Sequence, residues 1–214
     1  MKTELVVAWY KEKLTWIDEI KSPLIIYHKA IDRRFKIPNP RNLPNVGREA
    51  HTYLHHIVTE WDRLADWTVF TQADPAPHLS NGTIQQLLDA HESPTVVVPW
   101  LCRIKEWSDG GRLQWRGEWQ ARYRSEITPA SLTMASWFRE RLLMDLFARP
   151  HLCYHPGAIF GVPVARIKAR PMAFYERLLD DVSHACHPEE AHYLERAWLY
   201  LWDIDSCGVV IPCK

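Results

Sequence analysis

The first 27 residues alternate between short apolar runs and a stretch with helical spacing, and this alternation constrains the fold more than any other feature of the sequence. Residues 5–10 and 24–27 are apolar runs of strand length, and the stretch between them has apolar residues at helical spacing until Pro23. A strand, a helix and a strand in this order form a βαβ unit with a right-handed crossover. We therefore expect an α/β fold with a mixed, mostly parallel central sheet flanked by helices. Its ligand site should follow Ala8 and Ile26, at the carboxyl ends of the first strands.

The remaining chain continues the alternation. The pattern predicts helices over residues 48–64, 83–90, 131–146, 171–182 and from 189 onward, and strands over 67–72, 95–98 and 158–162. Residues 102–123 carry Trp107, Trp115 and Trp119 without a clean period, and we expect a long loop or irregular hairpin there. Residues 208–214 look like the start of a strand or linker. We therefore expect one domain over residues 1–214, with a continuation into a longer chain left open.

Length, charge and hydropathy exclude several classes of protein. The 214 residues fit one hydrophobic core, and 26 basic against 26 acidic residues leave no net positive field for nucleic acid. The longest apolar runs are far shorter than the roughly 20 residues that cross a bilayer, and the N-terminal run is too short for a secretory signal. The five cysteines form no Cys-x-x-Cys pair, so we interpret them as free thiols. We expect a cytoplasmic protein without a membrane span.

An acidic residue follows the strand predicted over residues 67–72. Asp74 stands where a parallel sheet opens its crevice, and its carboxylate could hold Mg²⁺ or Mn²⁺ there. The simpler alternative is a turn-forming aspartate before Pro75. His78 could add an imidazole ligand or be an ordinary surface histidine.

A glycine precedes the helix predicted from residue 48. The start of such a helix offers free N–H groups to an anion, and the Arg48 guanidinium suits phosphate or sugar hydroxyls. His51 and His55 have the spacing of a zinc pair, but no glutamate follows His51, so the metalloprotease motif is absent. We interpret both as core or supporting histidines.

The last predicted helix carries Glu195, which could be a general base or a sugar ligand. The alternative is a charge pair with Arg196 or Arg177 on a solvated face. The sequence has no Gly-x-Ser-x-Gly, no phosphate-binding loop of the Gly-x4-Gly-Lys-Ser/Thr type and no Gly-x-Gly-x-x-Gly.

Six segments together resemble a family known as a domain of unknown function, which is similar to small GT-A-type glycosyltransferases. The likeness includes the N-terminal glycosyltransferase domain of a multidomain chlorovirus enzyme that builds capsid glycans. The segments are 6–12 (VVAWYKE), 24–29 (LIIYHK), 43–56 (LPNVGREAHTYLHH), 69–75 (VFTQADP), 170–178 (RPMAFYERL) and 193–198 (YLERAW).

The resemblance implies a hexosyltransferase-like enzyme of glycan biosynthesis, for example in viral capsid glycosylation. With the help of Mn²⁺ or Mg²⁺, it would move a sugar from a nucleotide-diphospho-sugar, a UDP-sugar, to an acceptor glycan hydroxyl. The resemblance favours retention of configuration at the anomeric carbon over inversion. Arg48 would face the diphosphate or sugar, and Asp74 would be the metal carboxylate of an Asp-x-Asp-like element in which Gln72 replaces the first aspartate. Glu195 is the candidate base for an inverting reaction. The remaining implied contacts to the nucleotide or donor are Ala8, Trp9, Tyr10, Tyr27, Lys29 and Ala73.

Two other functions stay open at this point. One is a sugar- or nucleotide-binding module that has lost catalysis, since the first aspartate is missing. The other is a metal-dependent hydrolase that uses His51, His55 and a carboxylate.

Overall fold

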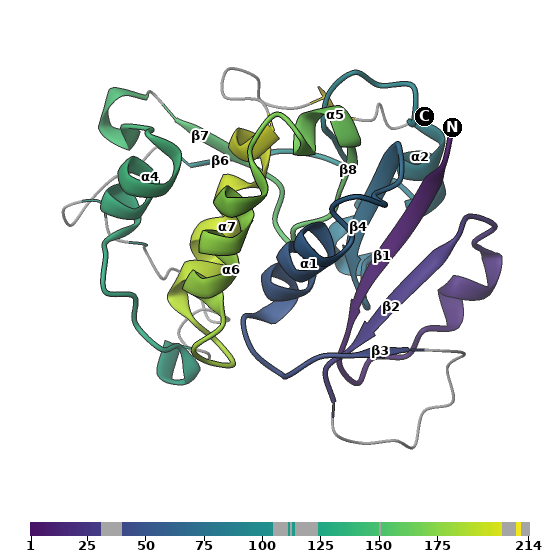
Figure 1. The fold of residues 1–214 in the computed structure, drawn as a ribbon, viewed down its shortest axis with the longest axis horizontal. Helices are drawn as coiled ribbons and strands as arrows, with labels where there is room; N and C mark the ends of the chain where they lie inside the picture. Colours follow the sequence, from purple (N-terminus) through teal and green to yellow (C-terminus); the bar gives the residue numbers. More distant parts are fainter. Residues whose placement is uncertain are drawn as a thin grey trace.

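Three parallel strands stand side by side at the start of the chain. The computed structural model describes residues 1–30, 40–104, 111, 113, 124–149, 151–202 and 209–210. In it, β1 (Thr3–Trp9) lies between β2 (Leu24–His28) and β4 (Trp67–Gln72), as Figure 1 shows. Val6 of β1 is in register with Ile25 on one side and Phe70 on the other. These runs are rich in β-branched and aromatic residues, which favour strands buried on both faces.

Four shorter strands extend the sheet to seven in the order β3-β2-β1-β4-β8-β5-β9. Among these described strands, only β8 runs against its neighbours, and every other pair is parallel. The prediction of a mixed, mostly parallel sheet flanked by helices is therefore confirmed. The four strands are β3 (Arg41–Asn42), β5 (Val97–Val98), β8 (Phe160–Pro163) and β9 (Val209–Val210), and a separate antiparallel pair joins β6 (Cys102–Ile104) to β7 (Leu152–Tyr154).

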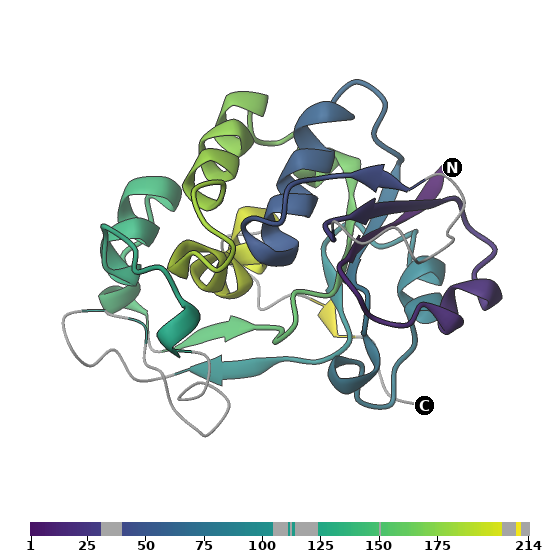
Figure 2. The same cartoon turned by 90° about the horizontal axis from the view of Figure 1, so that it is seen from below.

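Helices cover both faces of the sheet (Figure 2). On one face, α1 (Arg48–Thr59), α6 (Met172–Val182) and α7 (Glu189–Trp202) share a core with alternate strand residues such as Val6 and Phe70. On the other face, η1 (Thr15–Glu19) and α2 (Ile84–Asp89) share a second core. The remaining elements are η2 (Ala76–His78), η4 (Arg124–Glu126), α4 (Met134–Leu142), η5 (Leu146–Ala148) and α5 (Val164–Ile167).

Most tryptophans of the described residues serve packing. Trp9, Trp67, Trp137 and Trp198 are at most 2% exposed. The Trp67 indole N–H donates to the Leu87 carbonyl oxygen at 2.9 Å, and its ring lies so close to the Gly161 backbone that a Cβ there would be 2.3 Å from a ring carbon. Trp107, Trp115 and Trp119, which we expected in a long loop or irregular hairpin, lie outside the described residues.

Several predicted boundaries are wrong for identifiable reasons. The first crossover is a 3-10 helix of 5 residues, because few residues separate β1 from β2. α1 ends at Thr59 instead of residue 64, since the chain must turn back toward β4. α4 ends at Leu142, where Leu143 takes a left-handed φ of +56°.

The cysteines also depart from expectation. Cys153 is disulfide-bonded, so the interpretation of all five cysteines as free thiols is wrong, although Cys102 and Cys186 are free. None of the helices in the described part of the chain is both long and apolar enough to cross a membrane.

Candidate active site at the carboxyl edge of the sheet

The strand ends bring several predicted residues together. Ala8 of β1 is paired with Tyr27 of β2 on one side and with Gln72 of β4 on the other. The Lys29 backbone N–H donates to the Trp9 carbonyl oxygen at 2.9 Å. Parallel strands end at the same edge of a sheet, so residues that follow β1, β2 and β4 lie along one edge.

Asp74 lies at this edge, two residues beyond β4, and its side chain is exposed to solvent. Gln72 is half-buried, and Ala73 is buried with its carbonyl oxygen bound by the Trp16 indole N–H at 2.8 Å. Among the residues that the structure describes, no three His, Cys, Asp or Glu side chains form a group that could hold a metal ion. In the described part of this edge, Asp74 offers an exposed carboxylate. This arrangement fits a Mg²⁺ or Mn²⁺ ion that takes its other ligands from water and substrate phosphates.

The aromatic residues predicted for a nucleotide pocket are mostly turned inward. Trp9 is 1% exposed and stacks on His28 with ring centroids 4.1 Å apart. Tyr27 is also buried, and its hydroxyl accepts from the Arg41 guanidinium at 3.0 Å and contacts the His56 imidazole at 3.1 Å. Of the three predicted aromatic residues, Tyr10 alone has an exposed side chain.

Lys29 holds the loop before α1. Its side chain is 5% exposed, and the ammonium group donates to the Val46 carbonyl oxygen at 2.5 Å and to the Arg48 carbonyl oxygen. Burial lowers the pKa of Lys29 to about 8; the Glu49 charge opposes this shift and the Arg48 charge adds to it. Lys29 thus acts on the backbone next to Arg48, whereas the resemblance implied a direct contact with the nucleotide.

The start of α1 has the properties of an anion site. Gly47 (φ +62°) and Arg48 (φ +50°) are both left-handed, and no side chain caps the helix. A Cβ at Gly47 would be 2.4 Å from the Val182 carbonyl oxygen, so glycine is required there. Uncapped N–H groups at a helix start favour anions, and a non-glycine residue with positive φ is uncommon enough to suggest a functional constraint. The Arg48 side chain is 27% exposed, and its Nε lies 3.6 Å from Glu49 Oε2.

Glu195 is anchored by two donors. Its Oε1 accepts from the Gly157 backbone N–H at 2.8 Å, and its Oε2 accepts from the Arg196 guanidinium at 3.0 Å. Burial by itself would raise the pKa of Glu195, but Arg196, the Gly157 N–H, His192 and Arg48 together lower it below its ordinary value. A carboxylate with a lowered pKa is a weak base. Glu195 is therefore an ionised carboxylate held between the Gly157 N–H and the Arg196 guanidinium.

Gly157 joins residues from distant parts of the chain. Its φ is +91°, and a Cβ there would be 2.5 Å from Cγ of the His78 ring, while its N–H binds Glu195. Next to it, His155 donates from Nδ1 to the Trp100 carbonyl oxygen at 3.0 Å, and the Trp100 indole N–H donates to the His78 carbonyl oxygen at 2.7 Å. Burial lowers the pKa of His155 to about 4, so it is neutral near pH 7. The structure thus brings the predicted residues His78 and Glu195 into one cluster.

Sequence reasoning did not identify His155, Gly157 or Trp100. The Pro156-Gly157 pair was the available signal, since such pairs mark turns.

His51 and His55 stack with ring centroids 6.1 Å apart, and burial together with the Lys29 charge lowers the pKa of His51 to about 4. Within the described residues they are not part of a group of three or more His, Cys, Asp or Glu side chains that could hold a metal ion.

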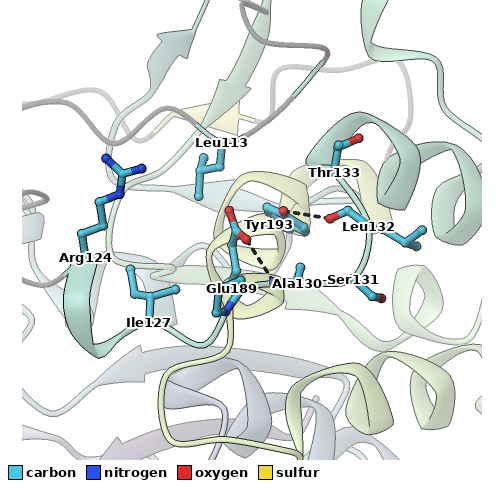
Figure 3. A pocket seen from close by; sticks show the side chains of 10 residues that line it. Leu113, Arg124, Ile127, Ala130, Ser131, Leu132, Thr133, Glu189 and Tyr193 are labelled. Carbon is cyan, nitrogen blue, oxygen red and sulfur yellow. Dashed lines mark hydrogen bonds between the residues drawn. The ribbon is translucent and has the colours of Figure 1, made fainter.

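Neither of two cavities lined by described residues includes Asp74, Arg48 or Glu195. One of about 290 Å³ lies between residues 127–133 and the first turns of α7 (Figure 3). The other, of about 360 Å³, lies between η1 and the start of α2, next to Pro75.

The sequence identifies the family of the chain. The model of the family described as "Protein of unknown function (DUF3431)" matches residues 5–209, so the chain belongs to this family. No curated protein matches the sequence.

Proposed function

We propose that this protein is a glycosyltransferase that moves a sugar from a nucleotide-diphospho-sugar, a UDP-sugar, to a hydroxyl group of an acceptor glycan. The observation that carries the proposal is the shared edge of β1, β2 and β4, where the free Asp74 carboxylate follows β4. Arg48 stands at the uncapped start of α1. A mixed, mostly parallel sheet is also what the GT-A resemblance predicts.

The chemistry requires stabilisation of a departing diphosphate. When the bond between the anomeric carbon and the phosphate oxygen breaks, its electron pair stays with the diphosphate, and negative charge grows there. Groups that bind this charge more strongly in the transition state than in the ground state accelerate the reaction. The Arg48 guanidinium and the N–H groups at the start of α1 supply such groups.

A bound Mn²⁺ or Mg²⁺ would neutralise part of the same charge. Asp74 would hold this ion, with the Gln72 side-chain oxygen as a second protein ligand. His78 remains a less suitable third ligand, because its ring packs against Gly157.

Glu195 supports a retaining outcome more than an inverting one. An inverting reaction needs a carboxylate that removes the acceptor proton, but the pKa of Glu195 is lowered by its guanidinium and N–H partners. An ionised carboxylate stabilises the positive charge that develops on the sugar ring. We therefore assign Glu195 this electrostatic role.

Calorimetric titration with UDP, with and without Mn²⁺, tests the proposal. Wild-type protein should bind UDP more tightly with Mn²⁺, and Asp74→Asn should lose most of this metal-dependent gain, by a factor of about 10 or more. Asp62→Asn is the matched control, since Asp62 is an exposed aspartate in the turn after α1. Absence of UDP binding under both conditions would refute the proposed transfer.

A second candidate function is a binding module without catalysis. Gln72 in place of an aspartate and the two occupied oxygens of Glu195 favour it. Slow hydrolysis of the UDP-sugar with Mn²⁺, abolished in Asp74→Asn, would decide for the enzyme. UDP binding without hydrolysis or transfer would decide for the module. A cytoplasmic location stays a prediction of the sequence.

A further inference from the structure

A pocket of about 290 Å³ lies beside α7 and is not used by the transfer chemistry above. Glu189 and Tyr193 of α7 line it from one side, and the segment from η4 to α4 lines it from the other. Figure 3 shows Arg124 and Thr133 on opposite sides of the Glu189 carboxylate. The pocket thus lies between α7 and the segment from η4 to α4.

Hydrogen bonds fix the pocket walls. Glu189 Oε2 accepts from the Ala130 backbone N–H at 3.0 Å, and the Tyr193 hydroxyl donates to the Leu132 carbonyl oxygen at 3.1 Å. The Glu189 N–H donates to the Thr128 carbonyl oxygen at 2.9 Å. Because the loop is held at several points, little ordering of the walls would accompany ligand binding.

The lining matches the chemistry of a carbohydrate. A carboxylate has about four acceptor positions, so Glu189 can accept hydrogen bonds beyond the one from Ala130. Ser131 and Thr133 add hydroxyl groups and Arg124 adds a guanidinium, while Ile127 and Leu132 are aliphatic. A sugar presents hydroxyls at its edges and C–H groups on its faces, and pockets of this mixed kind can satisfy both.

The pocket is close to the candidate transfer site. Glu189 and Glu195 lie on the same helix, six residues apart, which corresponds to about 9 Å along the axis. The Thr128 N–H also donates to the His187 carbonyl oxygen at 2.9 Å. The Gly47 N–H at the start of α1 donates to the Ala185 carbonyl oxygen at 2.8 Å, so residues 185–187 connect the start of α1 with the segment after η4.

We propose that this pocket binds one sugar unit of the acceptor glycan, with Glu189 accepting hydrogen bonds from its hydroxyls. The inference rests on the proposed glycosyltransferase function and names the place of the acceptor, which sequence reasoning left open. Tyr193 and Glu189 position the acceptor, and Glu195 acts on the donor sugar.

Saturation-transfer NMR with methyl glycosides of glucose, galactose, mannose and xylose tests the pocket. At least one glycoside should bind wild-type protein, and Ile127→Trp, which fills the pocket, should weaken this binding by about tenfold or more. Ser125→Trp is the matched control, because Ser125 is exposed in η4, two residues before Ile127, and does not line the pocket. Glu189→Gln keeps an oxygen for the Ala130 N–H and should weaken binding several-fold.

The outcomes separate the two proposals. Equal glycoside binding in wild type, Ile127→Trp and Glu189→Gln would overturn the acceptor pocket, as would binding of none of the four glycosides. Competition by a serine- or threonine-containing peptide instead of a glycoside would also overturn it. UDP affinity, measured on the same samples, should be unchanged in all variants. If wild-type protein does not bind UDP, the transferase proposal is refuted. If wild-type protein binds UDP but binds glycosides no better than the pocket variants do, only the pocket proposal is refuted. Glu189→Gln keeps the test decisive if Ile127→Trp does not fold.

Discussion

Replacing the buried Glu4 should show how much one carboxylate inside the sheet contributes to stability. Glu4 lies in β1 and is 3% exposed. Its Oε1 is 3.2 Å from His56 Nε2, and it accepts from the Ala65 N–H at 3.2 Å and the Thr68 hydroxyl at 3.1 Å. Glu4→Gln keeps an oxygen for these partners but removes the charge. Hydrogen bonds to a charged acceptor contribute roughly 1.5–3 kcal/mol, and neutral ones roughly 0.5–1.5 kcal/mol.

We therefore expect Glu4→Gln to lower the free energy of unfolding by roughly 2 kcal/mol at pH 7. For a chain of this length the melting temperature should fall by about 4–8 °C. Glu4→Leu should cost more, roughly 3–5 kcal/mol, because it leaves three buried partners unsatisfied. Asp18→Asn in η1, where Asp18 is exposed, is the control and should change little.

The same substitution predicts a pH dependence with a defined sign. Burial opposes ionisation of Glu4, but its hydrogen bonds and the His56 charge lower its pKa below the ordinary value of 4.5. The ionised Glu4 carboxylate stabilises the fold fully above the pKa that Glu4 has in the unfolded chain. This contribution is lost as the pH falls through the pKa of Glu4 in the folded protein. In urea unfolding, the difference in free energy of unfolding between wild type and Glu4→Gln should therefore decrease below about pH 4.5. If this difference is absent at pH 7, or constant down to pH 3, the reasoning is refuted.

Two further predictions concern backbone conformation. Gly47→Ala should destabilise the fold by at least about 2 kcal/mol in urea unfolding, because φ is +62° and the new Cβ would meet the Val182 carbonyl oxygen; an unchanged midpoint would contradict this. Leu143→Gly should stabilise the protein by roughly 0.5–1 kcal/mol, since Leu143 has a φ of +56° and is 88% exposed. Leu143→Ala keeps the Cβ and should give no such gain, so equal effects of the two substitutions would argue against backbone strain.

Local sequence signals were sufficient for much of the fold. The strand over residues 67–72 was predicted with the bounds that the structure shows, because its β-branched and aromatic residues are followed closely by prolines. The prediction of α1 failed at its end. Trp61 and Leu64 continue the apolar period, but they pack from the turn after the helix, where the Trp61 ring centroid lies 5.9 Å from that of Tyr175. Periodicity cannot distinguish a helical residue from a turn residue that faces the same core.

The candidate site was predictable only where it depends on strand ends. Ala8, Gln72 and Asp74 follow from the βαβ pattern, since parallel strands align their ends. The contact between Gly157 and His78 spans 79 residues and depends on β8 entering the sheet beside β4, which no local pattern reveals. The inward position of Trp9 was available from the sequence, because Trp9 shares its phase in β1 with the buried Leu5 and Val7.

The order of the strands has a consequence for biosynthesis. β8 lies between β4 and β5 although it comes after both in the chain, and α7, which covers α1, comes later still. A nascent chain that has not yet emerged from the ribosome as far as residue 160 thus exposes one edge of β4 and the part of α1 that packs on α6 and α7. The first βαβ unit can form early, but stable folding must await release of the last helix, and nascent chains stalled before it should be substrates for chaperones.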